Sequence, residues 1–237
     1  MSDLDIIKKI EKELKVKLKK LGKIYADSKG YILNKRSQVT GLSLCNCGIL
    51  NLNRITTQLK SLENLTELNL RLNFFTDIST LKTFKNLTFL NLGGNSIHDI
   101  SPLKNLNKLS RLVLYVNQIE ELPRWIIDFN MEINMAGNEA DGYIDLYSNP
   151  LKTPPPEIVK QGKEAVRNYF EQLKAQEEDY LFEAKMLIVG EPGAGKTSMA
   201  WKMENASCEL PMEEETTKGI DVKQFYFPLR KEDFSEI

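Results

Sequence analysis

The chain has 237 residues, a formal net charge of −1 at pH 7 and 41% hydrophobic residues, which describes a globular protein with room for more than one core. A near-neutral charge without a basic stripe argues against nucleic acid as the main partner. No continuous apolar run predicts a signal peptide or a membrane-spanning helix, so we expect a cytoplasmic protein.

Cysteine usage agrees with a reducing compartment. The chain has three cysteines, of which Cys45 and Cys47 form a single CxC and Cys208 stands alone. With one histidine in the whole chain, neither a disulfide framework nor a zinc site is expected.

Apolar residues recur at helical spacing near the N-terminus, at Leu4, Ile7, Ile10, Leu14 and Leu18. This stripe predicts a capping helix over residues 1–24 that covers one end of the core that follows. The alternative, a helix that binds a membrane surface, is disfavoured because the stripe contains no aromatic residue.

A repeated pattern, LxxLxLxxN, begins at Leu65, Leu87 and Leu109, and its asparagines, Asn73, Asn95 and Asn117, are 22 residues apart. A weaker copy begins at Val39 with Cys47 in place of asparagine, and a degraded copy spans 129–138. The pattern predicts leucine-rich repeats over residues 25–152, with structural asparagines in the turns. Residues 143–151 are expected to finish the solenoid.

Residues between the core leucines of each strand are expected to face outward on the concave side of the solenoid. Among them, the arginines and aromatic residues are those that dominate protein interfaces. We therefore predict that Arg71, Phe89, Arg111 and Tyr115 bind a protein partner. A merely solvated sheet face is the alternative.

Three prolines, Pro154 to Pro156, end the repeats and begin a predicted connecting helix over residues 153–180. Its apolar face is expected to dock against a neighbouring element. The members of that face are Ile158, Val159, Val166, Tyr169, Phe170 and Leu173. The pair Gln161 and Gly162 is a weak point within it.

A phosphate-binding loop is predicted between a strand-like run, 184–189, and a helix-like run, 196–203. Its glycines let backbone N–H groups converge on a phosphate, the lysine reaches the β- and γ-phosphates, and the threonine binds Mg²⁺. The predicted nucleotide-binding residues are Gly190, Glu191, Pro192, Gly193, Ala194, Gly195, Lys196, Thr197 and Ser198. No catalytic residue is assigned.

The run from Leu146 to Leu151, the prolines with the Tyr169-Phe170 helix, and the loop at 190–198 together resemble the junction between repeats and Roc domain in Roco proteins. The resemblance implies that residues 181–237 belong to a Roc (Ras-of-complex) GTPase domain that binds GTP or GDP with Mg²⁺. It also implies a COR region that forms homodimers, for which this chain has no sequence, and no kinase domain lies in this chain. The preference for guanine comes from the resemblance alone.

The segment from Thr216 to Val222 is similar to switch I and the following strand of Ras-like domains. Thr217 is the candidate switch threonine, which would join Thr197 as a ligand of Mg²⁺ and sense the γ-phosphate. Ordinary residues at the entry to a strand are the alternative.

The expected fold class is therefore α/β, a leucine-rich repeat horseshoe followed by the N-terminal part of a Ras-like P-loop domain. Switch II and the guanine-specificity motif do not occur before Ile237, so we expect a truncated chain without turnover. The predicted function is a Roco-type GTP-binding regulator whose repeats bind a protein. The alternative is a repeat interaction module with a non-functional remnant of a nucleotide domain. Innate-immune-type ATPases are disfavoured because their repeats follow the nucleotide domain.

Overall fold

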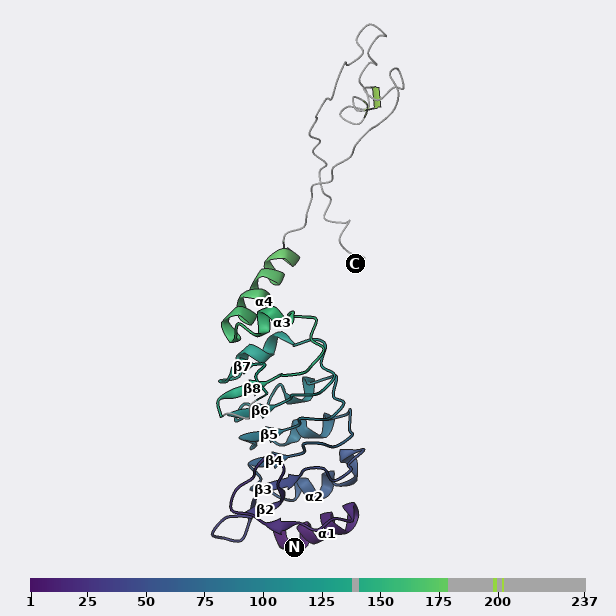
Figure 1. Ribbon diagram of the computed structural model, residues 1–237, viewed down its shortest axis with the longest axis vertical. Coiled ribbons are helices and arrows are strands. Elements are labelled where there is room, and N and C mark those ends of the chain that lie inside the picture. Colours follow the sequence, from purple (N-terminus) through teal and green to yellow (C-terminus); the bar gives the residue numbers. More distant parts are fainter. Residues whose placement is uncertain (138–140, 179–197, 200–201, 203–237) are drawn as a thin grey trace. The chain divides into compact units, whose positions relative to one another are not determined.

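The computed structural model describes residues 1–137, 141–178, 198–199 and 202, and the chain divides into two compact units, Met1–Asp179 and Tyr180–Ile237. The described strands all lie in the first unit. They form one eight-stranded sheet with the order β1-β2-β3-β4-β5-β6-β8-β7. Short helices return the chain along the other side of the stack, as Figure 1 shows.

The strands are short, as expected for repeats that each add one rung to a sheet. They are β1 (Lys19–Lys20), β2 (Lys29–Leu33), β3 (Val39–Leu44), β4 (Glu67–Asn69), β5 (Phe89–Asn91), β6 (Arg111–Val113), β7 (Glu132–Asn134) and β8 (Tyr143–Asp145). The α-helices are α1 (Asp3–Leu14), α2 (Thr56–Lys60), α3 (Pro156–Val159) and α4 (Lys163–Glu178). The 3₁₀ helices are η1 (Leu52–Arg54), η2 (Ser79–Thr83), η3 (Ser101–Leu103) and η4 (Arg124–Asp128).

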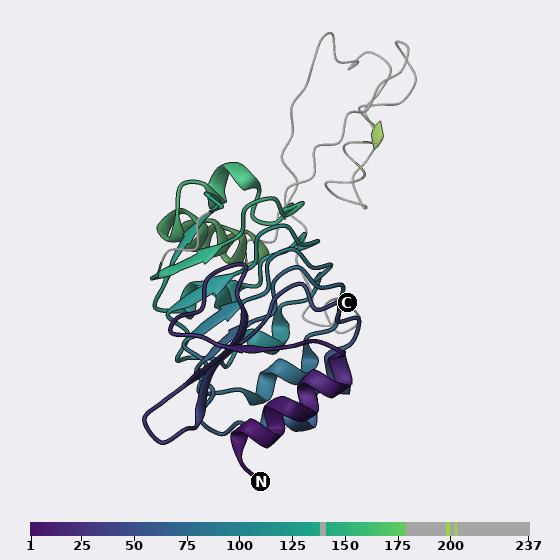
Figure 2. The same cartoon turned by 60° about the horizontal axis from the view of Figure 1, so that its bottom comes forward.

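The N-terminal end of the stack is a polypeptide cap built from α1 and the antiparallel pair β2 and β3. Ser2 and Asp5 form a capping box that starts α1, and the left-handed Lys15 ends it. Ile6, Ile7 and Ile10 are buried in the repeat core. Helix α1 lies across this end of the stack in Figures 1 and 2.

The predicted capping region extended to residue 24, whereas α1 ends at Leu14. Beyond it, Lys19 and Lys20 form a strand, and residues 21–28 form neither helix nor strand. Leu18 is buried as the apolar stripe suggested, but it lies outside the helix. Gly22 and the polar residues beside it do not sustain helical periodicity, so tertiary contacts decide the path of this segment.

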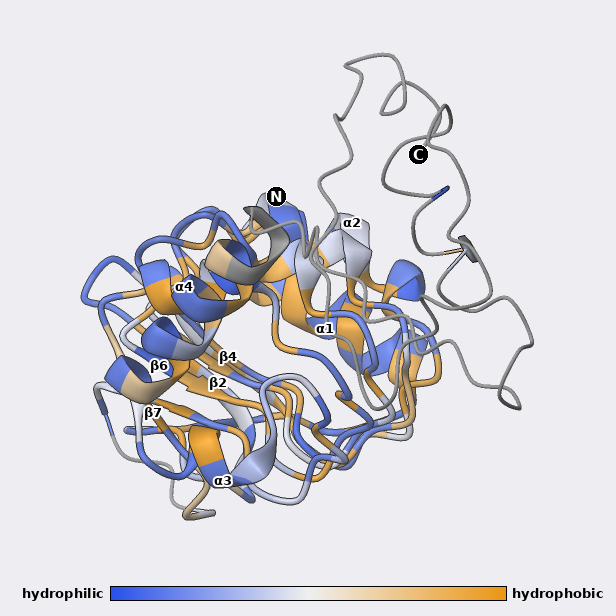
Figure 3. Cartoon of the chain, turned by 90° about the horizontal axis from the view of Figure 1, so that it is seen from above, coloured by the Kyte–Doolittle hydropathy of each residue, from blue (hydrophilic) through white to orange (hydrophobic). Residues whose placement is uncertain are grey.

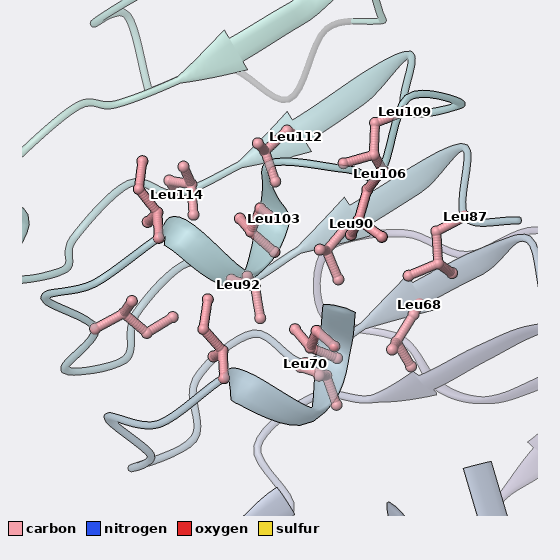
Figure 4. Close-up of a cluster of buried hydrophobic side chains, with 14 of the residues drawn as sticks. Leu68, Leu70, Leu87, Leu90, Leu92, Leu103, Leu106, Leu109, Leu112 and Leu114 are labelled. Carbon is pink, nitrogen blue, oxygen red and sulfur yellow. The ribbon is translucent and has the colours of Figure 1, made fainter. Parts of the chain in front are cut away.

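The core of the stack is a column of leucines between the sheet and the returning turns. Strands β3, β4, β5 and β6 are parallel and in register, so that Leu42, Leu68, Leu90 and Leu112 stand directly above one another. All four side chains are fully buried. In the view along the stack the apolar residues gather on the inner sides of strands and helices (Figure 3), and Figure 4 shows the leucines meeting there.

Buried asparagines tie each turn to the next rung. The Asn117 side-chain amide donates to the carbonyl oxygens of Leu92 at 3.0 Å and Leu114 at 2.9 Å, and its oxygen accepts from the Ile97 N–H at 3.1 Å. Asn73 and Asn95 donate to carbonyl oxygens in the same pattern. Their structural role, expected from the sequence, is therefore confirmed.

The residue before each asparagine position takes a left-handed backbone conformation. It is occupied by Asn46, Leu72, Gly94, Val116 and Ser148, with φ between 49° and 67°. The turn after the strand requires this conformation in every repeat, and glycine fills it only once. For a branched residue such as Val116 this backbone costs about 1 kcal/mol or more.

The fifth rung of the stack is formed by a different segment from the one expected. Strand β8 pairs with β6, and β7 lies outside β8 at the edge of the sheet, so the two strands stand in inverted order. Asn149 donates to the carbonyl oxygen of Leu114 and continues the asparagine series. Residues 129–138 therefore do not stack on the fourth repeat, because Ile144, Leu146 and Asn149 complete the repeat pattern better and take that place.

The C-terminal end of the first unit is covered by α3 and α4. Val159, Val166 and Phe170 are buried in the repeat core, as the apolar face predicted. The connecting helix is not continuous, because Gly162 has a φ of 94° and separates α3 from α4. Among the described helices, none is long and apolar enough to cross a membrane.

Candidate functional site

The open face of the sheet, which points away from the leucine core, carries three columns of side chains. Strand pairing aligns the first two columns, and backbone hydrogen bonds between successive strand exits align the third. The first column holds Gly41, Glu67, Phe89, Arg111 and Tyr143; the second holds Ser43, Asn69, Asn91, Val113 and Asp145; the third holds Cys45, Arg71, Gly93, Tyr115 and Tyr147.

A segment of the chain itself lies on this face. We call residues Leu21–Ser28, which connect β1 to β2, the strap. Ile24 of the strap is 2% exposed and forms a small apolar cluster with Phe89 and Val113, against which Tyr115 also packs. In Figure 2 the strap runs across the strands of the open face. Phe89 and Val113 of the face are therefore buried together with a residue of the same chain.

Polar contacts fix the strap to the second and third columns. The Asn69 amide donates to the carbonyl oxygens of Tyr25 at 3.2 Å and Ala26 at 2.9 Å. The Arg71 guanidinium forms an ion pair with the Asp27 carboxylate, and the Ser43 hydroxyl donates to the Ser28 carbonyl oxygen. The strap thus supplies bonding partners for polar side chains of the sheet, which would bond to water if the strap were absent.

The base of the strap is held by the pairing of β1 with β2. Lys19 pairs with Gly30, and the Leu21 N–H donates to the Tyr31 carbonyl oxygen at 2.8 Å. A Cβ on Gly30 would lie 2.0 Å from the Lys19 carbonyl oxygen, so only glycine allows this approach. At the tip, a Cβ on Gly41 would lie 3.0 Å from Ile24 Cδ1, so the strap rests directly on the sheet backbone.

Two arginine–aromatic pairs stand on the open face. The Arg111 guanidinium lies 3.7 Å from the ring centre of Phe89 and 3.4 Å from the Asp141 carboxylate. The Arg71 guanidinium lies 5.8 Å from the ring centre of Tyr115 and donates to its hydroxyl oxygen. Flat cations over aromatic rings are strong elements of binding surfaces, because they combine charge with contact area.

Burial and nearby charges shift the pKa values of Arg71 and Cys45. Burial would lower the pKa of Arg71, but the Tyr115 oxygen and the Asp27 carboxylate outweigh it and raise that pKa. Burial raises the pKa of the Cys45 thiol, and the Arg71 guanidinium partly opposes this. Cys45, in the third column, is 3% exposed and stays a neutral thiol at ordinary pH.

The four predicted partner-binding residues, Arg71, Phe89, Arg111 and Tyr115, lie together on the open face. Their role in partner binding stays a prediction. Arg71 pairs with the strap, Phe89 belongs to the apolar cluster around Ile24, and Tyr115 packs against that cluster. Phe89 is 5% exposed, far less than a free interface residue would be. The sequence did not reveal that the chain covers its own face.

The predicted phosphate loop Gly190–Thr197 and the switch candidate Thr217 lie outside the described residues. Ser198 is described and is helical together with Met199. Within the described residues, no cluster of three or more histidine, cysteine, aspartate or glutamate side chains could hold a metal ion.

The strap residues Ile24 and Asp27 were missed by sequence reasoning. The available signal was Ile24, an isolated aliphatic residue between Gly22 and polar residues, out of phase with the preceding helical stripe. Its partners Phe89 and Val113 are more than sixty residues away in sequence, and single-sequence periodicity reports only local structure.

Comparison with known proteins supports the assignment of leucine-rich repeats. A family model described as Leucine Rich repeats (2 copies) matches residues 85–125. A protein named Roc-COR-CHAT protease, from an unidentified prokaryote, is 32% identical over 83 residues, which cover 32% of this chain and 8% of that protein. The chain thus spans less than a tenth of the length of this relative.

Solved structures with a similar arrangement are also repeat proteins. The LRR ectodomain of the receptor kinase SOBIR1 from Arabidopsis thaliana is 20% identical, with a TM-score of 0.41, and the match covers 65% of this chain and 97% of that one. Internalin C2 from Listeria monocytogenes is 24% identical, with a TM-score of 0.35, covering 53% of this chain and 69% of that one. The family model and the parallel pairing of β3 to β6 show that the chain contains leucine-rich repeats arranged as a solenoid.

Proposed function

We propose that the repeats bind an extended segment of a protein partner on the open face, and that residues 190–198 of the same chain bind a guanine nucleotide with Mg²⁺. The observation that carries the first half is the strap. A face that already holds a peptide through Ile24, the Asn69 amide and Arg71 has the groups needed to hold another. Leucine-rich repeats commonly use this face for proteins.

Peptide selection tests the first half. Random displayed peptides are selected against the full chain, both native and with Ile24→Asp, which removes the anchor of the strap. We expect binders to at least one of these chains, and we expect their binding to be lost when Phe89 and Tyr115 are both replaced by serine. Failure to select any peptide on either chain would overturn the proposed binding function.

The second half is supported by the sequence from Gly190 to Thr197 and by the likeness to the Roc-COR-CHAT protease. In this proposal Lys196 holds the β- and γ-phosphates, and Thr197 with Thr217 supplies oxygen ligands to Mg²⁺. In this proposal the repeats receive the partner, and the nucleotide state is the output.

Titration with fluorescent GTP, GDP and ATP in the presence of Mg²⁺ tests this half. We expect saturable binding that prefers guanine and falls by about a hundredfold or more in Lys196→Ala, because the lysine neutralises phosphate charge. Lys202→Ala, which changes an exposed lysine of the same segment, is the matched control. Absence of binding by any nucleotide would favour the second candidate, a repeat interaction module without a nucleotide function.

A further inference from the structure

The open face recognises the strap at two side chains and through its backbone. Ile24 is buried among apolar residues, and Asp27 pairs with Arg71. Between them, Tyr25 is 68% exposed, and the Asn69 amide of the sheet bonds to the carbonyl oxygens of Tyr25 and Ala26. Peptide recognition generally works this way: hydrogen bonds to the main chain tolerate any side chain, and pockets select particular side chains.

The strap can leave the face without opening the leucine core. Its apolar cluster, Ile24 with Phe89 and Val113, is separate from the cluster that contains the stacked leucines. Most other strap residues are exposed or half-buried, so one side chain carries most of the apolar contact. Segments with few buried contacts open locally at lower cost than the core.

The strap leaves part of the open face uncovered. Tyr143 continues the first column beyond Arg111, and Tyr147 continues the third column beyond Tyr115. They are 37% and 51% exposed. A partner longer than the strap would reproduce the contacts of Ile24 and Asp27 and would add contacts with these two tyrosines. That additional area is what allows a separate chain to compete with an intramolecular segment.

We infer that the open face accepts an extended protein segment in which an aliphatic residue is followed three positions later by a carboxylate, and that the strap is a resident mimic which such a partner displaces. This inference rests on the proposed peptide-binding function. The positive Arg71 selects the carboxylate, and the cluster around Phe89 selects the aliphatic side chain. The strap protects the apolar face until the partner arrives.

A synthetic peptide with the sequence of residues 20–29 tests the inference in trans. We expect it to bind the Ile24→Asp full chain at least about tenfold more tightly than the native chain, whose own strap competes. A peptide with Ile24→Asp and Asp27→Lys is expected not to bind. Equal binding of the two peptides would overturn the inference. Leu50→Asp, at an exposed apolar residue away from the strap, is the control chain and should behave as the native chain does.

Proteolysis of the strap gives a second readout in the native chain, so the test does not depend on folding of the Ile24 variant. Lys23 is an exposed residue of the strap, and trypsin cleavage after it is followed by mass spectrometry. An excess of a longer acidic-aliphatic partner peptide is expected to raise the rate of this cleavage several-fold, because a displaced strap is a free loop. An unchanged rate at a peptide concentration that saturates binding would overturn the displacement.

Two further outcomes separate this inference from the proposed function. If selected peptides bind the open face but lack the aliphatic residue and the carboxylate, the inference is wrong and the peptide-binding function stands. If native chains form dimers in sedimentation and lose them in Ile24→Asp, the face belongs to the strap of a second copy, which also overturns the inference.

Discussion

The side-chain amide of each buried asparagine forms hydrogen bonds with backbone groups in the turn after a strand, where the strand itself is too short to supply partners. Asn117 is 2% exposed and bonds to three carbonyl oxygens and one N–H. A buried carbonyl or N–H that loses its partner costs more than the bond itself contributes. Individual residues of this kind therefore carry a large share of the stability of each turn.

Replacing Asn117 with alanine is expected to lower the free energy of unfolding by roughly 2–3 kcal/mol, because several buried backbone groups lose their partner at once. Urea unfolding followed by circular dichroism measures the change. Asn107→Ala, at an exposed asparagine just before the same repeat, should stay within about 0.5 kcal/mol of the native chain. An equal loss in both variants would contradict the structural role of the buried amide.

The neutral thiol of Cys45 predicts how stability depends on pH. Burial raises its pKa above the ordinary value of 9.0 in the folded chain. The stabilisation is therefore complete below that value and is lost as pH rises through the folded pKa. We expect the urea midpoint of the native chain to fall more steeply above about pH 9 than that of Cys45→Ala. Parallel curves for the two chains would argue against a buried thiol.

Among the elements of the fold, the short strand β1 holds the base of the strap. It has only Lys19 and Lys20, and it reaches β2 because Gly30 has no Cβ. The parallel pairing of β1 and β2 then projects the strap between them over the open face. A short loop with a fixed base loses less entropy on docking than a free tail would.

Gly30→Ala is expected to break this pairing and release the strap, with a loss of about 1–3 kcal/mol, because backbone atoms must move to admit the methyl group. Hydrogen exchange of the Leu21 amide and trypsin cleavage after Lys23 should both become faster. Gly22→Ala, within the strap itself, meets no atom within 4 Å and serves as the matched control. Similar exchange rates in the two variants would show that Gly30 is not needed for the pairing of β1 with β2.

The repeat unit as a whole is closed at both ends by its own helices. α1 covers the N-terminal rung, and α3 with α4 covers the C-terminal rung through Val159, Val166 and Phe170. A solenoid without such caps would expose its leucines to water. The inverted order of β7 and β8 places the strand with the better repeat match next to β6, and leaves β7 beside the C-terminal cap (Figure 1).

Residues 1–179 are expected to fold as an independent unit. The shortened chain should unfold cooperatively in urea, with a midpoint close to that of the corresponding transition in the full chain, because this unit is compact by itself. Circular dichroism and size-exclusion chromatography check this. An aggregated or unfolded product would mean that the second unit contributes to the stability of the first.

Patterns in the amino-acid sequence were sufficient to predict the repeats, their leucine core, the asparagine turns and the apolar face of α4. These features are periodic and local, so the residue type at each position indicates whether that position is buried or exposed. The same periodicity placed Arg71, Phe89, Arg111 and Tyr115 on one face of the sheet. It also predicted a phosphate loop, which lies outside the described residues.

The strap and the exchange of β7 with β8 became visible only in the folded chain. Both depend on contacts between residues far apart in sequence, such as Ile24 with Phe89 or Leu114 with Asn149. A face that is open in the repeat pattern is covered because a distant segment buries one aliphatic side chain and satisfies polar groups there. Competition between segments for the same place is a property of the folded chain, and no local pattern encodes its outcome.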